Sequence, residues 1–325
     1  MIHSKVIIIG GGPAGSSCAW RLNHYGIECL ILDKQPFPRS KLCAGWITPQ
    51  VIDDLSIDVS TYPHTLTSFS EFHIHLFNKE MTLKVQQYAI RRKEFDYWLL
   101  ERSGVPIYLH TVQEIKHSRD HFQIDNLFCC SYLVGAGGTY CPVYRTFFKR
   151  SNPRPKNLLI TTLEEEFPCD IQDYNCHLWF LYNKLSGYAW YVPKRDGYVN
   201  IGIGGYLEKL KSHHDSIANQ WQCFTRELER ISLVNGHRFN AKGYNYYIRN
   251  RTDSLQIDRI YLIGDAAGLA TRDMGEGIGP AVRSGIAVAD AIASGKRFSL
   301  SSVKKHSFPR YQTYVKLFAK FLLNE

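Results

Sequence analysis

Small residues near the N-terminus have the spacing of a dinucleotide-binding turn. The predicted turn consists of Gly10, Gly12, Pro13, Ala14 and Gly15. It follows the apolar run 6–9, which is typical of a buried parallel strand, and it precedes a helical pattern. The first glycine permits a tight turn, the second lets the backbone approach a diphosphate, and the third allows close packing of helix on strand. The N–H groups that open the helix would then hold the phosphates.

An acidic residue follows at the distance that this pattern requires. The second apolar run, 29–32, ends at Asp33, and Asp33 and the adjoining Lys34 are both predicted to be cofactor-binding residues. A carboxylate at this position would bind the ribose hydroxyls of an adenosine, although it could also be a plain turn residue. Strand, glycines, helix, strand and acid together predict a dinucleotide site for NAD or FAD.

The next segment, 34–50, carries two bases and a small-residue turn. One interpretation is a connecting loop. The other is that Arg39 and Lys41 face the phosphates or ring of a flavin, while the turn Cys43, Ala44, Gly45 lets the backbone pass close beside it. The Cys43 thiol would be either a proton donor near the ring or a buried structural group.

From about residue 151 the pattern changes, and it reverts after residue 250. Alternating and aromatic segments between these points predict an antiparallel sheet, and 207–234 has helical spacing. We therefore expect a mixed α/β (α+β) fold in which a Rossmann-like dinucleotide-binding domain, which the family resemblance given below implies is an FAD-binding domain, is interleaved with an antiparallel-sheet domain, which it implies is the substrate domain. The first domain is predicted to comprise 1–66, 88–150 and 253–297, and the second to comprise 67–87 and 151–252. A helical segment, 298–325, ends abruptly at Glu325, which suggests a shortened tail.

Several separated motifs now occur in one order. They are the glycine turn with Asp33, the pattern Arg92-x-x-Phe95-Asp96, the turn 135–138, the pair Gly264-Asp265, and the turn 275–278. This set resembles FAD-dependent oxidoreductases of the p-hydroxybenzoate hydroxylase fold, and most of all the geranylgeranyl reductase family. Segment 41–45 is similar to that family's K-x-C-G-G turn, with Ala44 in place of a glycine. Segment 188–194 is similar to its Y-x-W-x-F-P-K motif, with Val192 in place of phenylalanine.

The resemblance implies roles for particular residues. Arg92 would contact FAD, and Asp265 would bind the ribityl chain. The remaining cofactor-binding positions implied are Ala136, Gly137, Gly264, Gly275, Gly277 and Ile278, the last three at the pyrimidine edge of the ring. Two positions depart from the family pattern. Gly137-Gly138 replaces an Asp-Gly pair, and Arg272 replaces a proline. Arg272 could bind an anionic substrate group or reductant, or pair with Asp273.

The resemblance also suggests the chemistry. Tyr188 and Trp190 share one strand face and, with Cys43, are the predicted catalytic or cavity residues, unless that face is simply core. We expect an FAD-dependent oxidoreductase that reduces or dehydrogenates an apolar, isoprenoid or lipid-like substrate. The alternatives are a monooxygenase that hydroxylates an aromatic compound, and a non-catalytic flavin-binding or electron-carrying protein. No second G-x-G-x-x-G unit occurs, so NAD(P)H would bind transiently or a ferredoxin-like protein would supply electrons.

Composition and charge limit the partners and the cellular location that we expect for this protein. The net charge of +9 is spread along the chain without a basic helix, which argues against nucleic acid as a partner. No long apolar run and no signal-peptide pattern are present, so we expect a cytoplasmic protein, either free or peripheral to the inner face of a membrane. His73 and His75 share a strand face, but no nearby third ligand favours a metal. The oligomeric state stays open.

Overall fold

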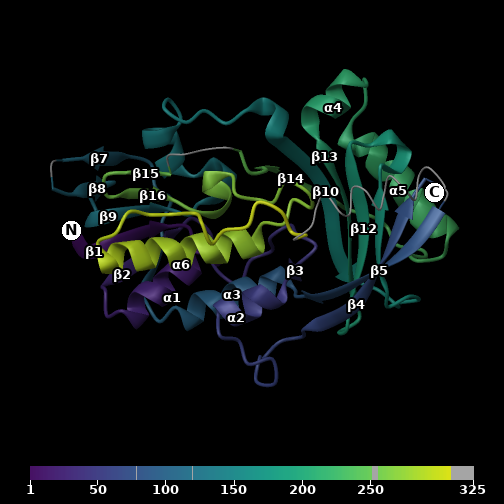
Figure 1. Cartoon of the computed structure of the whole chain (residues 1–325), viewed down its shortest axis with the longest axis horizontal. Helices are drawn as coiled ribbons and strands as arrows, with labels where there is room; N and C mark the ends of the chain where they lie inside the picture. The colour runs from purple at the N-terminus through teal and green to yellow at the C-terminus, as the bar shows by residue number, and fades with distance from the viewer. Residues whose placement is uncertain (78, 119, 251–254, 309–325) are drawn as a thin grey trace.

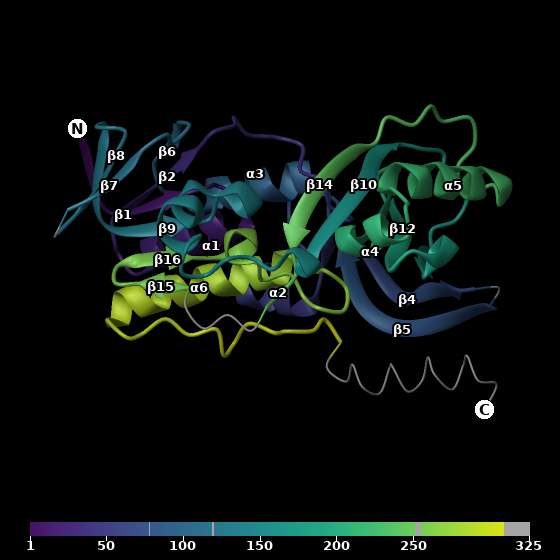
Figure 2. The ribbon, with the colours of Figure 1, turned by 90° about the horizontal axis from the view of Figure 1, so that it is seen from above.

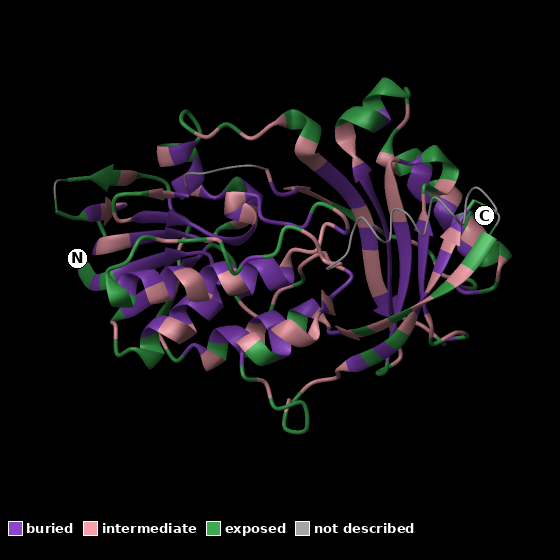
Figure 3. Ribbon diagram, in the orientation of Figure 1, coloured by how far each residue is buried: buried purple, intermediate pink, exposed green. Residues whose placement is uncertain are grey.

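Two β-sheets with helices packed on them lie along the long axis of the molecule (Figure 1). The computed structural model describes residues 1–77, 79–118, 120–250 and 255–308. Most of the predicted helical segment 298–325 lies outside these residues, and its described part, 298–308, contains no helix. In Figure 3 the buried residues concentrate in the strands of both sheets and in the helices that pack against them. These observations confirm the mixed α/β class, whereas the domain boundaries stay a prediction.

The first sheet is mainly parallel. Its order is β15 (Gln256–Ile257), β16 (Ile260–Leu262), β9 (Phe128–Gly135), β1 (Ile2–Ile9), β2 (Cys29–Asp33) and β6 (Ile107–Leu109), with the hairpin β7 (Ile115–His117) and β8 (Phe122–Ile124) added beside β9. Within the sheet Ile8 pairs with Ile31 on one side and with Val134 on the other. The apolar runs 6–9 and 29–32 therefore form neighbouring buried strands, as their composition predicts.

Three helices cover one side of this sheet (Figures 1 and 2). They are α1 (Pro13–His24), α3 (Arg92–Arg102) and α6 (Ile278–Ser294), while the short α2 (Pro49–Asp54) packs nearby. Side chains of α1 and α6 form one apolar cluster with β1, including Val6, Leu22 and Val288. This packing fixes the starts of both helices relative to the strands.

The second sheet is antiparallel with one exception. Its order is β14 (Lys242–Tyr247), β10 (Leu159–Pro168), β13 (Tyr198–Tyr206), β12 (Gly187–Lys194), β11 (Cys176–Phe180), β4 (Thr67–Leu76), β5 (Lys79–Ala89) and β3 (Trp46–Ile47). Strands β4 and β11 run parallel. The predicted antiparallel sheet is therefore present, and this one pair runs parallel because its strands come from distant segments and no hairpin fixes their direction.

The two faces of the second sheet have different neighbours. Helix α5 (Ile217–Arg230) lies on the side away from the first sheet (Figure 1), and we call this the outer face. The inner face is the one that carries Tyr188 and Trp190 and meets the turns after the first sheet's strands. The prediction of one helix over 207–234 is wrong. The chain breaks after α4 (Leu207–Ser212), where His214 has a φ of +53°, and Ser216 then caps α5.

Candidate functional site

The predicted glycine turn meets two other turns at the carboxyl ends of the parallel strands. Gly10 has a φ of +112°, and a side chain there would lie 2.5 Å from the carbonyl oxygen of Ala136. A side chain at Gly264 would lie 2.9 Å from Ala14. The turns that follow β1, β9 and β16 are thus in contact, and ligands of open parallel sheets bind at this edge.

Asp33 lies where the sequence places it, at the end of β2. Its carboxylate accepts hydrogen bonds from the N–H groups of Gly11, at 2.7 Å, and Gln35, at 2.9 Å. Lys34 beside it is exposed. The carboxylate therefore joins the second strand to the glycine turn.

Arg39 lies across the glycine turn. Its Nη2 is 3.9 Å from the Asp33 carboxylate and would be 3.8 Å from a side chain at Gly12. The Arg39 Nε is buried and has no hydrogen-bond partner among the described residues. An unused buried donor and the first N–H groups of α1 make a site for an anion. The residues present therefore fit the diphosphate of FAD.

Lys41 and Asp265 both contact Tyr244. The Lys41 Nζ is 3.0 Å from the centre of the Tyr244 ring, and the Tyr244 hydroxyl donates to the Asp265 carboxylate at 3.4 Å. Burial lowers the pKa of Lys41 to about 8, against the attraction of Asp265 for its charge. Sequence reasoning missed Tyr244, because nothing local marks which tyrosine of β14 faces the turns.

Arg92 contacts both Asp96 and Cys43. Its Nε and Nη2 donate to the two Asp96 carboxylate oxygens at 2.7 Å each, so the arginine charge is balanced within α3. The guanidinium also lies close enough to the Cys43 thiol for its charge to act on the thiol. Burial raises the pKa of this thiol, and the Arg92 charge opposes the rise. The structure thus brings Cys43 and Arg92 together, while their predicted roles toward FAD stay predictions.

The aromatic residues of β12 are hydrogen bonded to groups on the inner face. The Tyr188 hydroxyl donates to the Met274 carbonyl at 2.6 Å. The Trp190 Nε1 donates to the Asn200 side-chain oxygen at 2.7 Å. Tyr188 is thereby fastened to the turn that precedes α6, and Trp190 to the neighbouring strand. The predicted shared face is confirmed, and the predicted role of both side chains in catalysis stays untested.

Two further contacts hold the turn that contains Cys43. The Asn200 side-chain nitrogen donates to the Cys43 carbonyl at 3.3 Å, and the buried Lys194 amine donates to the Ala44 carbonyl at 2.6 Å. A side chain at Gly45 would lie 2.1 Å from the Ile90 carbonyl oxygen. The segment 188–194 therefore positions the turn at 43–45 as well as the turn before α6.

The turn 275–278 leads directly into α6. Gly275 has a φ of +61°, and a side chain there would lie 2.3 Å from the Tyr246 hydroxyl. A side chain at Gly277 would lie 3.4 Å from the Asp265 carboxylate, and α6 begins at Ile278. The helix start thus lies beside Asp265. Its first N–H groups have no partner within their own helix, so negative charge is favoured there.

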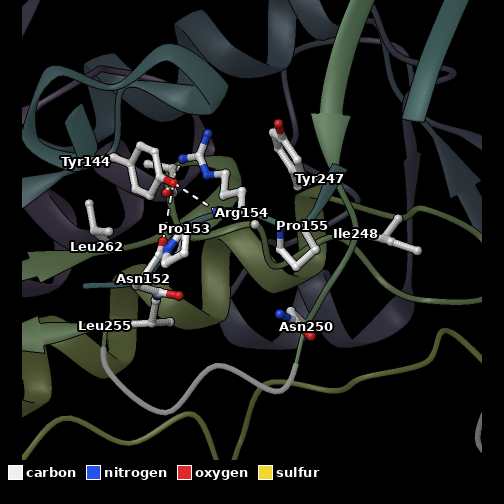
Figure 4. A pocket seen from close by; sticks show the side chains of 13 residues that line it. Tyr144, Asn152, Pro153, Arg154, Pro155, Tyr247, Ile248, Asn250, Leu255 and Leu262 are labelled. Atoms are coloured by element: carbon white, nitrogen blue, oxygen red, sulfur yellow. Dashed lines mark hydrogen bonds between the residues drawn. The ribbon is translucent and has the colours of Figure 1, made fainter. Parts of the chain in front are cut away.

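Arg154 is a site-supporting residue that the sequence pattern does not reveal. Its guanidinium donates to the carbonyls of Thr139, at 2.5 Å, and Ala266, at 2.6 Å, and it stacks on the Tyr144 ring at 3.6 Å. Figure 4 shows Arg154 in the small pocket beside Tyr144 and Tyr247. Because Thr139 and Ala266 belong to the turns after β9 and β16, Arg154 holds these two turns together.

A small pocket with apolar and polar lining lies between the inner face and the segment after α6. It is lined by Trp46, Thr48, Phe72, Gln87, Met274, Glu276, Ser307 and Phe308. The covering segment is held by Asp273, whose carboxylate accepts from the backbone N–H groups of Ser307, at 2.9 Å, and Phe308, at 3.1 Å. The predicted pairing of Asp273 with Arg272 is not among the ion pairs of the described residues, and Arg272 is exposed.

His73 and His75 acquire a third histidine in the fold. The His75 Nε2 and the His177 Nδ1 are 2.9 Å apart, and the His177 Nε2 is 3.0 Å from the Asp173 carboxylate. In the part of the chain that the structure describes, no group of histidine, cysteine and acidic residues has the arrangement of a metal site. No described helix has the length and apolar character to span a bilayer.

Three turns meet here beside a helix start that can bind an anion. This arrangement is typical of proteins that bind a dinucleotide. Residues 5–98 match the family described as FAD dependent oxidoreductase. Over 311 residues the chain is 32% identical to an uncharacterized protein of Methanosarcina barkeri, which covers 89% of this chain and 74% of that protein. Over 343 residues it is 24% identical to digeranylgeranylglycerophospholipid reductase 1 of Methanosphaera stadtmanae, covering 98% of this chain and 81% of that enzyme.

A solved structure shows the same fold. The crystal structure of a geranylgeranyl bacteriochlorophyll reductase-like protein from Thermoplasma acidophilum superposes with a TM-score of 0.76 at 18% sequence identity. The superposition covers 98% of this chain and 84% of that chain. The chain belongs to the FAD-dependent oxidoreductases, and it is similar to proteins named as geranylgeranyl-type reductases.

Proposed function

We propose that this protein reduces carbon–carbon double bonds of an apolar, isoprenoid or lipid-like substrate. The observation that carries the proposal is the pocket between Trp46, Phe72 and Phe308, which adjoins the turn before α6. Four of its eight lining residues, Trp46, Phe72, Met274 and Phe308, are apolar and would contact a hydrocarbon chain. The names of the related reductases support the same substrate class. FAD, when bound, would supply the hydride for such a reduction.

The chain offers a coherent set of groups for holding FAD. We propose that Arg39 and the N–H groups of the turn 12–15 bind the diphosphate and that Asp33 binds the adenosine ribose. Asp265 would bind the ribityl chain, and the start of α6 would face the pyrimidine edge of the ring. The dipole of α6 favours the negative charge that accumulates there on reduction.

Other residues keep this arrangement in place. Tyr188 fixes the turn before α6 through the Met274 carbonyl, and Lys194 fixes the turn at 43–45 through Ala44. Phe308 and Trp46 line the pocket, where they would exclude water from the reacting bond. The function we assign to these side chains is positioning and desolvation.

The electron donor and the membrane contact are separate proposals. NAD(P)H or a ferredoxin-like protein would reach the site transiently and reduce FAD. The net charge of +9 would favour attraction to an anionic bilayer, from which an apolar substrate could be taken. Stopped-flow reduction by each donor, and sedimentation with phosphatidylglycerol vesicles at low and high salt, test these two points.

The reaction is tested with FAD-loaded protein reduced by dithionite without oxygen. Geranylgeranyl diphosphate, a digeranylgeranyl phospholipid and menaquinone are offered in turn, and mass spectrometry detects two added hydrogens for each reduced bond. Saturation of an isoprenoid bond supports the proposal. A protein that cannot be loaded with FAD contradicts it. So does incorporation of labelled oxygen into an aromatic compound in air, which would indicate a monooxygenase.

A further inference from the structure

Gln87 is a polar residue among apolar side chains on the inner face. It lies on β5 directly opposite Phe69 of β4, and the preceding pair on this face is Leu83 with Phe72. Residues directly opposite one another share a face of the sheet. Phe69, Phe72 and Leu83 all belong to the apolar cluster of the inner face. Gln87 therefore interrupts an apolar surface, and it does so where it lines the pocket.

The amide oxygen of Gln87 is an unused hydrogen-bond acceptor. Its Oε1 is buried and has no partner among the described residues. A buried acceptor that is left unpaired costs free energy, and almost all such groups in native proteins are paired. The Gln87 oxygen therefore indicates a place in the pocket where a donor from outside the chain can bind.

Thr48 lies beside Gln87 and provides the complementary group. Ile47 of β3 pairs with Tyr88 of β5, so the next residues in the same register, Thr48 and Gln87, face one another. Thr48 occupies the N-cap position of α2, but its hydroxyl makes no capping hydrogen bond. Both residues line the pocket. A ligand hydroxyl can donate to the amide oxygen and accept from the threonine hydroxyl.

The charges around the pocket favour a neutral ligand group. Glu276 and Ser307 also line the pocket, and the Ser307 hydroxyl donates to the Glu276 carboxyl at 3.2 Å. The described lining residues include no lysine or arginine, and Lys304 and Lys305 of the segment after α6 are exposed. A phosphate inside the pocket would meet the oxygens of Gln87 and Glu276 without a lining cation, which is costly for a buried charge.

We propose that the pocket binds the hydroxyl group of an isoprenoid alcohol, which donates to Gln87 and accepts from Thr48. The inference rests on the proposed function and narrows its substrate class. The attached hydrocarbon chain would contact Trp46, Phe72 and Phe308 of the same pocket. A site built to hydrogen bond to a hydroxyl strongly rejects analogues that lack the group, because its own polar atoms are then left unpaired. Gln87 is thus a specificity-determining residue.

The test measures binding, so it does not depend on turnover. Farnesol, its methyl ether and farnesyl diphosphate are each titrated into FAD-loaded protein in a calorimeter. The methyl ether accepts hydrogen bonds but donates none, so farnesol should bind about tenfold more tightly than the ether. Farnesyl diphosphate lacks the free hydroxyl, so its affinity should not depend on Gln87.

The variants compare Gln87→Leu with Gln86→Leu on the same strand. Gln86 is the matched control, because it is exposed and does not line the pocket. Gln87→Leu should weaken farnesol about tenfold and change the ether and the diphosphate by no more than about twofold. Gln86→Leu should change none of the three. Gln87→Glu keeps an acceptor oxygen and should retain the preference for the alcohol, as expected for a hydrogen bond and not for pocket shape.

The outcomes separate the inference from the proposed function. Equal affinities of the wild-type protein for farnesol and its methyl ether overturn the inference, because water then satisfies Gln87 as well as the ligand does. A preference for the alcohol that survives Gln87→Leu also overturns it. Reduction of either compound would leave the proposed function intact in both cases. A protein that binds farnesol through Gln87 but reduces no isoprenoid contradicts the proposed function and supports the assignment of the binding site.

Discussion

The inner and outer faces of the second sheet are built from the same strands and both carry apolar clusters, but they bury different polar groups. On the outer face Tyr191, Ile201 and Ile203 pack against Phe224 of α5 in one apolar cluster. On the inner face Glu164 and Asn200 are buried polar groups, 3% and 2% exposed. Alternation along each strand separates the two sets.

This difference indicates that the outer face mainly stabilises the fold and that the inner face mainly serves the candidate site. Apolar burial stabilises the fold, whereas buried polar groups cost free energy unless each finds a partner. The inner face contains such buried polar groups, Glu164 and Asn200, where the turns of the candidate FAD site meet the sheet. Changes on the outer face should therefore lower stability, and changes on the inner face should act mainly on cofactor binding and reaction.

The largest effect is expected from Phe224→Ala on the outer face. Phe224 is fully buried against Trp179 and Tyr182, so truncation leaves a cavity and should lower the free energy of unfolding by about 3–5 kcal/mol. Urea unfolding measures this loss. FAD affinity of the folded protein, measured by flavin fluorescence, should stay within about twofold. A tenfold weaker FAD affinity would contradict the division between the faces.

Acidification should lower the free energy of unfolding, because it affects the histidines on the outer face of the second sheet. Burial and the neighbouring His177 lower the pKa of His75 from 6.5 to about 4, so the folded state keeps His75 neutral. Below pH 6.5 the unfolded chain binds more protons than the folded chain, and stability falls with pH until about pH 4. The expected loss is on the order of 2 kcal/mol, because the site is partly exposed.

The histidine prediction is checked by urea unfolding at pH 7 and pH 5. His75→Gln removes the titrating group and should flatten the difference between the two pH values. The burial-driven decrease in the pKa of His177 acts in the same direction, so some dependence should remain. An unchanged pH dependence in the variant would show that His75 is not responsible.

Asn200→Ala tests the inner face. The change leaves the Trp190 Nε1 without its acceptor and frees the Cys43 carbonyl, at a cost of about 1–2 kcal/mol. FAD affinity should fall about tenfold, because the turn at 43–45 loses a support. Asn219→Ala on the exposed side of α5 is the control and should change neither quantity. Equal effects of the two variants would refute the prediction.

The smallest effect is expected from Tyr188→Phe. One hydrogen bond to the Met274 carbonyl is removed and the ring stays in place, so stability should fall by about 1 kcal/mol or less. FAD affinity should weaken about threefold through the turn before α6. Isothermal titration with FAD resolves this change. A 100-fold loss would mean that Tyr188 contacts the cofactor or substrate directly.

Local patterns allowed much of the site to be predicted. The glycine turn and Asp33 lie within 25 residues of one another, and their spacing alone indicates strand, turn, helix and strand. The motif that contains Tyr188 and Trp190 was placed on the correct face because strands alternate. These features depend on residues close together in the sequence, so they could be predicted from the sequence alone.

The residues that were missed depend on distant partners. Arg154 binds the carbonyl of Ala266, 112 positions away, and Asn200 binds that of Cys43, 157 positions away. Nothing near Gln87 shows that Thr48 and Phe308 will line a pocket with it. The break at His214 was missed for another reason, since helical spacing continues across it and only the positive φ reveals it.

The late position of β16 in the chain has a consequence for synthesis. This strand pairs in parallel with β9, with Ile260 beside Leu133, yet β10 to β14 of the other sheet are translated between them. A ribosome therefore completes most of the second sheet before the first sheet can receive its last parallel strand. Such distant pairing delays folding. FAD binding should consequently be a late event, completed as α6 emerges from the ribosome.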